Sequence, residues 1–337
     1  MRAIVNTGPG RVAMVQAPAP EPGPGQVRVR TAACGVCATD LEMIAGWERT
    51  GFGCIPGHEW SGTVDAVGAG VDARMAGWPC VAENVLADGG EVGFEHPGGY
   101  GEFLLTEARN LYELPAGFPL SVAALIEPLA VGVRAVRRLR LQDGRGAVVF
   151  GDGPIGLILL MLLKRAGVER IVVVGGRPAR LRLAAEMGAS ATVNYHEAGG
   201  DLAAAVRRAA GEPLLALEAS GSTAAMDVCL NAVAGGGKVL VIGDYGSARA
   251  EFRWNHLLHR ELELIGSNAS AGAWPEAVRL ATGGEVPLGR LLTHRLPVER
   301  YEEAIELVGG RRPDVIKVVL EWGAGQAGAA RTVTGDA

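Results

Sequence analysis

The hexapeptide GDGPIG, residues 151–156, is the sequence feature that most constrains the fold of this chain. It directly follows the apolar run AVVF and directly precedes the apolar run LILLMLLKRAG. A strand, a glycine-rich turn and a helix in this order form the phosphate-binding turn of dinucleotide-binding domains. Gly151 permits the tight turn, Gly153 lets the backbone approach a pyrophosphate, and Gly156 lets the helix lie close to the strand. The helix N-terminus, with Pro154 and Ile155, offers free N–H groups to the anion.

The pattern around this turn predicts a parallel, doubly wound sheet. From about residue 119, helical periodicities at 122–139 and 180–188 alternate with compact β-branched runs. Such alternation places helices on both faces of a parallel sheet. The expected strands cover residues 147–150, 171–174, 214–217, 238–242 and 263–265.

The rest of the chain has a different pattern. Its first third is rich in Gly and Pro, with short alternating runs at 26–31 and 62–67, which predicts antiparallel β-structure with long loops. A chain of 337 residues is long enough for two domains. After Ser267 the pattern is mixed, and a last strand at 315–320 is expected to rejoin the first domain. We predict one domain from 1–128 and 266–337 and a second from 129–265, with 323–337 as a disordered tail.

Composition excludes several classes of partner. Hydrophobic residues make up 48% and charged residues 20%, which is typical of a globular protein with a substantial core. The net charge of -5 has no basic cluster behind it, so no nucleic-acid partner is expected. No apolar run reaches spanning length and the N-terminus lacks a signal-peptide core, so no membrane partner is expected either. Five sparse cysteines favour a reducing cytoplasm.

Cofactor choice is read at the end of the second strand of such a sheet. NAD-binding chains carry there a carboxylate that binds the adenosine ribose hydroxyls. This chain reads IVVVGGRP, with Gly175 at the carboxylate position, Gly176 beside it, and Arg177 next, a cation that can pair with a 2′-phosphate. The pattern is an NADP signature. The alternative is that Arg177 is a surface arginine in a loop.

Three separate segments offer metal-ligating side chains. CATD at 37–40 supplies a thiolate, PGHE at 56–59 an imidazole, and IEPLAVGV the carboxylate of Glu127. Such a set can hold a catalytic zinc ion and leave a fourth position open. Each residue also has a structural interpretation. Cys37 can be a buried small hydrophobe, His58 a hydrogen-bonded loop histidine, and Glu127 an acid stabilised by the N-terminal end of a helix dipole.

The order CGVCATD, PGHEWSGTV, IEPLAVGV, GDGPIG, LEASG and GGKVLVIG resembles the zinc-dependent medium-chain dehydrogenase/reductase family over essentially the whole chain. EPLAV resembles its polyol, threonine and glucose dehydrogenases, and EPLAV with GHEWSG and LEASG resembles aminocyclitol dehydrogenases of aminoglycoside biosynthesis. GGRP resembles the GSRP of NADP-dependent secondary alcohol dehydrogenases. The resemblance implies a GroES-like β-rich catalytic domain joined to a Rossmann domain.

The resemblance also implies roles at the metal centre. Cys37 and His58 would be zinc ligands, with Glu127 or Glu59 as the carboxylate ligand and water or substrate in the fourth position. The two glutamates would exchange during turnover. Asp40 would orient His58 and fix its tautomer.

The proton path and the cofactor contact follow from the same resemblance. Thr39 would hydrogen-bond the substrate oxygen and begin the proton relay, and Lys317 matches a basic residue near Glu59 and the cofactor pyrophosphate. Glu42, however, occupies the position often filled by a relay histidine. Glu42 either carries the proton with a raised pKa, binds a polar or amine-bearing substrate, or is an exposed acid.

A second departure concerns the structural zinc of the family. Between Cys80 and Tyr100 the chain contains a single cysteine, and one thiolate cannot build a closed four-coordinate site. We therefore predict one catalytic zinc and no structural zinc. A homodimer or homotetramer is expected. Four histidines outside the motifs are expected to be structural or exposed, namely His96, His256, His259 and His294.

These residues predict hydride transfer between NADPH/NADP+ and a small-molecule ketone or secondary alcohol, with ketone reduction favoured. The aminocyclitol resemblance suggests a polyhydroxylated or amine-bearing substrate, with Glu42 and Asp65 as available acids. Two alternatives are a zinc-free enoyl or quinone reductase of the same fold and a non-catalytic NADPH-binding sensor. The metal set argues against the first, and Thr39 with that set argues against the second.

Overall fold

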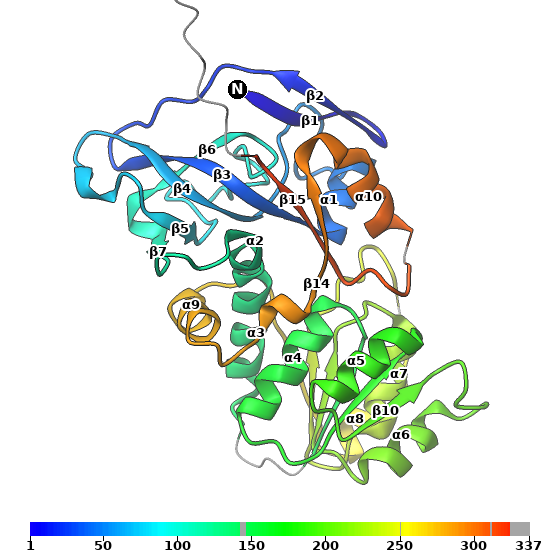
Figure 1. Cartoon of the computed structure of the whole chain (residues 1–337). Coiled ribbons are helices and arrows are strands. Elements are labelled where there is room, and N and C mark those ends of the chain that lie inside the picture. Colours follow the sequence, from blue (N-terminus) through cyan, green and yellow to red (C-terminus); the bar gives the residue numbers. More distant parts are fainter. Residues whose placement is uncertain (142–145, 250, 311, 324–337) are drawn as a thin grey trace, which may run out of the picture.

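The chain forms two units, each built on its own β-sheet, as the upper and lower halves of Figure 1 show. The computed structural model describes residues 1–141, 146–249, 251–310 and 312–323. The tail expected at 323–337 lies, apart from Gly323, outside the described residues. Within the described part of the chain, no helix has both the length and the apolar character needed to cross a membrane.

The first unit is a mostly antiparallel sheet with the order β14-β15-β3-β4-β5-β7, in which β6 also pairs with β3. The two late strands join the strands of the first third of the chain, because β15 pairs antiparallel with β3. A separate hairpin, β1-β2, lies beside this sheet. The strands are β1 Arg2–Gly8, β2 Arg11–Gln16, β3 Gln26–Val36, β4 Glu59–Val67, β5 Pro79–Ala82, β6 Phe103–Glu107, β7 Leu111–Glu113, β14 Leu292–Pro297 and β15 Lys317–Glu321.

The second unit is a parallel sheet with the order β10-β9-β8-β11-β12-β13. Successive side chains of its inner strands alternate between two cores, so that Val149 and Val173 face one layer of helices while Val148 and Val172 face the other. The predicted Rossmann-type sheet with helices on both faces is confirmed. The strands are β8 Ala147–Phe150, β9 Ile171–Gly175, β10 Ala191–Asn194, β11 Leu215–Glu218, β12 Lys238–Val241 and β13 Glu263–Gly266.

The helices follow the pattern of the sequence with one break. The stretch expected as one helix over 122–139 is two helices, because the chain leaves helical hydrogen bonding around Ala124 and Leu125. The helices are α1 Ala38–Ala45, α2 Leu120–Ala123, α3 Ile126–Leu139, α4 Pro154–Arg165, α5 Pro178–Glu186, α6 Leu202–Ala210, α7 Thr223–Ala232, α8 Trp254–His259, α9 Trp274–Thr282 and α10 Tyr301–Gly309. Short 3₁₀ turns lie at Ala73–Met75, Ala108–Asn110, Leu288–Arg290 and Val298–Arg300.

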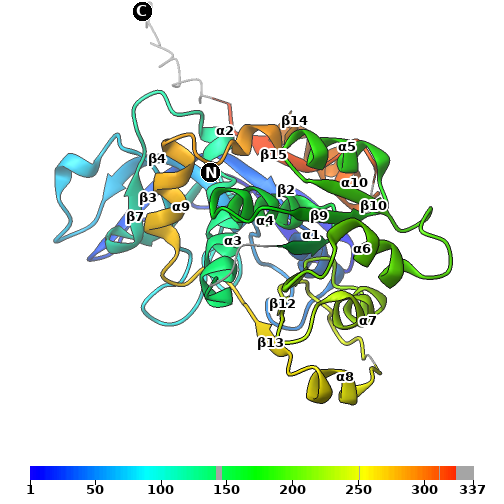
Figure 2. The same ribbon diagram turned by 90° about the horizontal axis from the view of Figure 1, so that it is seen from below.

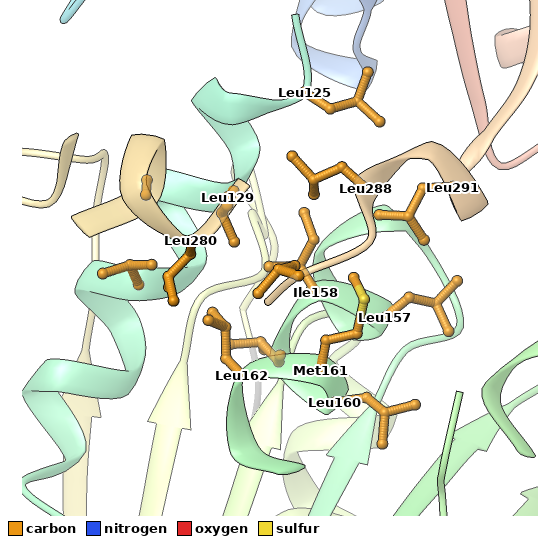
Figure 3. Close-up of a cluster of buried hydrophobic side chains, with 14 of the residues drawn as sticks. Leu125, Leu129, Leu157, Ile158, Leu160, Met161, Leu162, Leu280, Leu288 and Leu291 are labelled. Carbon is orange, nitrogen blue, oxygen red and sulfur yellow. The ribbon is translucent and has the colours of Figure 1, made fainter. Parts of the chain in front are cut away.

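Helix α3 connects the two units through the largest apolar core. Figure 3 shows Leu129 of α3 beside Leu280 of α9, with Ile158 of α4 in the same cluster, while Leu125, just before α3, lies next to Leu288. Gly132 allows this close approach, since a Cβ there would lie 2.5 Å from the Ile158 side chain. Figure 2 shows α3, α4 and α9 gathered on one face of the parallel sheet. The first turn of α3 is therefore held firmly between the units, and it carries Glu127.

Candidate metal and dinucleotide site

Three predicted ligands lie together at the edge of the first unit. Cys37 follows the end of β3 and caps α1, while His58 lies in the bend before β4 and Glu59 is the first residue of β4. One potential ligand atom from each side chain lies within 4.8 Å of the other two. Within the described ranges, this is the one group of this kind that could hold a metal ion.

Glycine beside these ligands leaves the room that they require. A Cβ on Gly35 would overlap Glu59 Oε2, so only glycine lets β3 run past this carboxylate. Gly57 has φ of +101°, and a Cβ there would lie 2.7 Å from the Tyr100 ring. The loop before β4 therefore depends on Gly57 to turn His58 towards Cys37.

Asp40 supports the ligands from behind, as the resemblance implies. Its Oδ2 accepts the Cys37 backbone N–H at 2.8 Å, and its Oδ1 lies 3.5 Å from His58 Nδ1. Burial by itself would lower the pKa of His58, but the Asp40 carboxylate and the Cys37 thiol hold it well above its usual value in the metal-free chain. Asp40 thus lies where it can fix the orientation of the imidazole.

Lys317 lies in the metal centre, paired with Glu59. Its Nζ donates to Glu59 Oε1 at 2.5 Å, and both side chains are almost completely buried. Glu59 Oε2 has no hydrogen-bond partner, although it is buried. A buried carboxylate oxygen without a donor is unfavourable unless a cation binds it. The donor set and this oxygen therefore fit a zinc ion, whose preferred ligands are sulfur, imidazole nitrogen and carboxylate oxygen.

Glu127 lies near this centre without belonging to the close group of three. Burial raises its pKa to about 7, with His58 lowering and Glu59 raising the value, so its carboxyl is within electrostatic range of both ligands.

Thr39 lies in the first turn of α1, and its Oγ1 accepts from the Cys37 thiol at 3.7 Å.

Glu42 is an exposed residue one turn along the same helix. Its pKa is raised, first by partial burial and then by the charge of Asp244, which follows β12 of the second unit. The structure thus brings an acid of the nucleotide-binding unit near Glu42. Sequence reasoning missed Asp244, although the motif GGKVLVIG ends at the residue before it, because nothing in that motif indicates that the next residue approaches α1.

The glycine turn has the predicted geometry. Gly151 has φ of +127° at the end of β8, and Gly153 is the N-cap of α4, whose first residue is Pro154. A Cβ on Gly156 would overlap the Gly151 carbonyl, so this glycine lets α4 start directly on the strand. The first turn of α4, which includes Ile155, carries the N–H groups suited to a pyrophosphate.

At the end of β9, Gly175 and Gly176 precede Arg177, the N-cap residue of α5. Arg177 binds Asp152, a residue of the glycine turn, through a bond of 2.7 Å from Nη1 to Oδ1. A Cβ on Gly176 would overlap the phenol of Tyr195, a half-exposed ring. Sequence reasoning missed both Asp152 and Tyr195. An acid inside the glycine motif is a sequence feature that could have identified Asp152. No such feature marks Tyr195.

The segment with the single cysteine is stabilised by side-chain contacts. Cys80 is buried in β5. Arg49 donates to Glu95 at 2.6 Å and to Glu91 at 2.9 Å, and its guanidinium lies 4.4 Å from the Phe94 ring. The Phe94 ring also contacts the His58 imidazole, with ring centroids 4.8 Å apart. Ion pairs and stacking therefore connect this segment to the metal centre.

Of the histidines expected to be structural or exposed, His96 binds Asp88 at 2.9 Å, and His256 and His259 lie in α8, where no side chain is buried. His294 lies in β14 beside Thr293.

Comparisons with known proteins agree with this geometry. The family described as "Zinc-binding dehydrogenase" matches residues 154–283, and "Alcohol dehydrogenase GroES-like domain" matches residues 23–116. The D-altritol 5-dehydrogenase of Agrobacterium fabrum is 31% identical over 88% of this chain and 93% of its own length. Human sorbitol dehydrogenase is 30% identical over 90% of this chain and 91% of its own.

A solved structure of 2R,3R-butanediol dehydrogenase from Bacillus subtilis superposes with a TM-score of 0.86 at 25% identity, covering 95% of this chain and 99% of that one. Sequence identity and coverage of this extent establish the relationship. The chain belongs to the family of zinc-binding medium-chain dehydrogenases and is an oxidoreductase of the alcohol and polyol dehydrogenase type.

Proposed function

We propose that the chain is a zinc-dependent, NADPH-preferring oxidoreductase that interconverts a ketone and a secondary alcohol, with Cys37, His58 and Glu59 as the resting zinc ligands. Two observations carry the metal assignment: a carboxylate oxygen of Glu59 lies within 4.8 Å of a thiol and an imidazole, and the buried Oε2 of Glu59 has no donor. One catalytic zinc, with no structural zinc, fits the burial of Cys80 in β5.

The protein side chains supply binding and orientation. When bound, zinc acts as a Lewis acid towards the substrate oxygen, and NADPH supplies the hydride. Asp40 orients His58, and Lys317 fixes the Glu59 carboxylate by binding its Oε1. Glu127, with a pKa near 7, is the second carboxylate that exchanges with Glu59 during turnover. Reduction is the favoured direction, because cellular NADPH pools are kept largely reduced.

Thr39 relays the proton: its hydroxyl donates to the substrate oxygen and takes a proton back from solvent water. Its hydroxyl is half-buried at the start of α1, next to Cys37, so it lies between the metal ligands and the helix surface. Glu42, one turn along α1 from Thr39, and Asp244 are two acids close enough to affect each other's charge. We propose that these two acids bind a hydroxyl-rich or amine-bearing substrate such as an aminocyclitol. The polyol relatives support the hydroxyl-rich part of this assignment.

The nucleotide contacts divide between two turns. The first turn of α4 and Lys317 are both proposed to bind the pyrophosphate. Arg177 is suited to the 2′-phosphate. Tyr195 offers an exposed ring beside Gly176.

The protein is proposed to be cytoplasmic and a homodimer or a homotetramer built from such dimers. Three large apolar side chains lie exposed at one end of the parallel sheet: Trp254 and Leu258 of α8 are 67% and 69% exposed, and Leu264 of β13 is 44% exposed. β13 is the last strand of that sheet, and an exposed apolar edge is a common surface for pairing between copies. Leu264→Glu should shift the molar mass in light scattering towards the monomer, while an unchanged mass would place the interface elsewhere.

The reaction is tested by metal analysis and NADPH oxidation on the same preparation. We expect one zinc per chain, with loss of ketone reduction on chelation and recovery on zinc addition. A panel of keto-polyols, amino-keto-cyclitols and aliphatic ketones then ranks the substrates. Metal-independent reduction of enoyl or quinone substrates would overturn the zinc proposal, and preference for simple aliphatic ketones would overturn the polyol assignment.

A further inference from the structure

We propose that Asp152, inside the glycine turn, determines cofactor specificity by positioning Arg177 for the 2′-phosphate. This inference rests on the proposed NADPH preference and assigns a role to a residue that the nucleotide-binding motif leaves unspecified. Asp152 is a positioning residue, since it acts through Arg177 and the backbone beside it.

The contacts of Asp152 use both of its carboxylate oxygens. Oδ2 accepts the backbone N–H groups of Gly176 and Arg177 at 3.0 and 2.9 Å, and Oδ1 accepts Nη1 of Arg177 at 2.7 Å. The side chain is only 4% exposed. The turn after β8 is therefore joined to the turn after β9 by three bonds to one buried carboxylate, which are of the stronger, charge-assisted kind.

Gly175 is the position that makes this arrangement possible. A Cβ on Gly175 would lie 2.6 Å from both Cβ and Oδ2 of Asp152, closer than real Cβ contacts. An acid at the end of β9 and an acid at 152 therefore exclude each other sterically, and two such carboxylates would also repel. In this chain the acid stands in the turn, where burial keeps it from a ribose hydroxyl, and not at the strand end.

The local charge favours an anion despite the carboxylate. Arg177 binds Asp152 directly, and Nη1 of the buried Arg180 lies 3.9 Å from Asp152 Oδ1. Two guanidinium groups around one carboxylate leave a net positive charge. Arginine carries five N–H donors, so it can bind a carboxylate and a phosphate together. Because Asp152 already holds the Arg177 side chain in place, less conformational entropy is lost when the phosphate binds.

The test measures the binding of NADPH and of NADH in the absence of substrate, monitored by nicotinamide fluorescence. Asp152→Asn should raise the Kd for NADPH by roughly tenfold or more while the Kd for NADH stays within about twofold, because only NADPH carries the 2′-phosphate. Arg177→Met should show the same selective loss. The double variant should lose little more than the worse single variant, because Asp152 acts through Arg177.

Asp72→Asn is the matched control, since Asp72 binds Arg74 and a backbone N–H in an exposed turn of the other unit. It should leave both Kd values unchanged. Thermal unfolding monitors whether Asp152→Asn folds. If it does not, the exchange Asp152→Gly with Gly175→Asp moves the acid to the strand end without the clash, and we expect this variant to bind NADH more tightly than NADPH.

The outcomes separate the two proposals. A wild-type protein that binds NADH more tightly than NADPH overturns the proposed NADPH preference. A wild-type preference for NADPH that Asp152→Asn leaves intact or strengthens overturns the positioning role of Asp152 and leaves the NADPH assignment standing. An exchange variant that keeps the wild-type preference for NADPH also overturns that role.

Discussion

Replacing Lys317 with methionine should destabilise the zinc-free protein far more than the zinc-loaded one. The Lys317 and Glu59 side chains are 4% and 2% exposed, and Nζ lies 2.5 Å from Oε1. Methionine retains most of the lysine volume but leaves the Glu59 charge buried without its partner. Breaking a buried ion pair from one side typically lowers the free energy of unfolding by about 3–5 kcal/mol. The low exposure of both side chains places this pair within that range.

Zinc should offset most of this loss. A divalent cation on Glu59 supplies opposite charge to the carboxylate that Lys317→Met leaves unpaired, so we expect a penalty of less than about 2 kcal/mol in the loaded protein. Urea unfolding of chelated and zinc-loaded samples, with wild type beside the variant, measures both values.

Lys238→Met is the control for loss of a lysine. Lys238 is half-buried, and its carboxylate neighbour Glu263 lies 3.7 Å away with its side chain 60% exposed, so about 1 kcal/mol or less is expected. Two results would refute the reasoning: a zinc-free Lys317→Met protein within about 1 kcal/mol of wild type, or a penalty that zinc does not change. Either would mean that Glu59 is not a charged group awaiting a cation.

Three further predictions concern the same region. Because burial raises the pKa of Glu127 from 4.5 to about 7, the folded zinc-free protein keeps a proton between these pH values that the unfolded chain releases. The free energy of unfolding should therefore fall by at most about 3 kcal/mol as pH rises through this window. Urea unfolding at several pH values measures this dependence, and Glu127→Gln should flatten it. Glu42→Gln should raise the KM for an amine-bearing polyol about fivefold and leave that for its neutral analogue unchanged; equal effects on both would exclude charge recognition. Arg49→Met should weaken zinc binding about tenfold in a chelator competition, because Arg49 and His58 both contact the Phe94 ring; unchanged affinity would show that this contact does not position His58.

Local patterns predicted the elements closely where several adjacent residues act together. The strand at 147–150 agrees in full with β8, and the glycine turn and α4 follow directly, because strand, turn and helix are set by neighbouring residues. The break between α2 and α3 was not predicted. Apolar periodicity continues across Ala124 and Leu125, and it does not record long-range contacts of this segment such as Ser61 Oγ donating to the Leu120 carbonyl.

The carboxylate ligand shows a second limit. Motifs alone left Glu59 and Glu127 equivalent as ligands. The structure places Glu59 in the close group with Cys37 and His58, and leaves Glu127 as a nearby acid with a raised pKa. The difference depends on the space beside Gly35, which no pattern within the PGHE segment records.

The sequence by itself determined the family, the two-unit organisation, the dinucleotide turn and the residues able to hold a metal, because each is recognised from short motifs and from their order along the chain. Only the tertiary structure decided how those residues are connected. Asp152 binds Arg177 across 25 positions, and Asp244 approaches Glu42 from the other unit. Such contacts depend on strand pairing and on the space left by glycines. Electrostatic interactions within a few ångströms are set by distance in space, which separation along the chain does not encode.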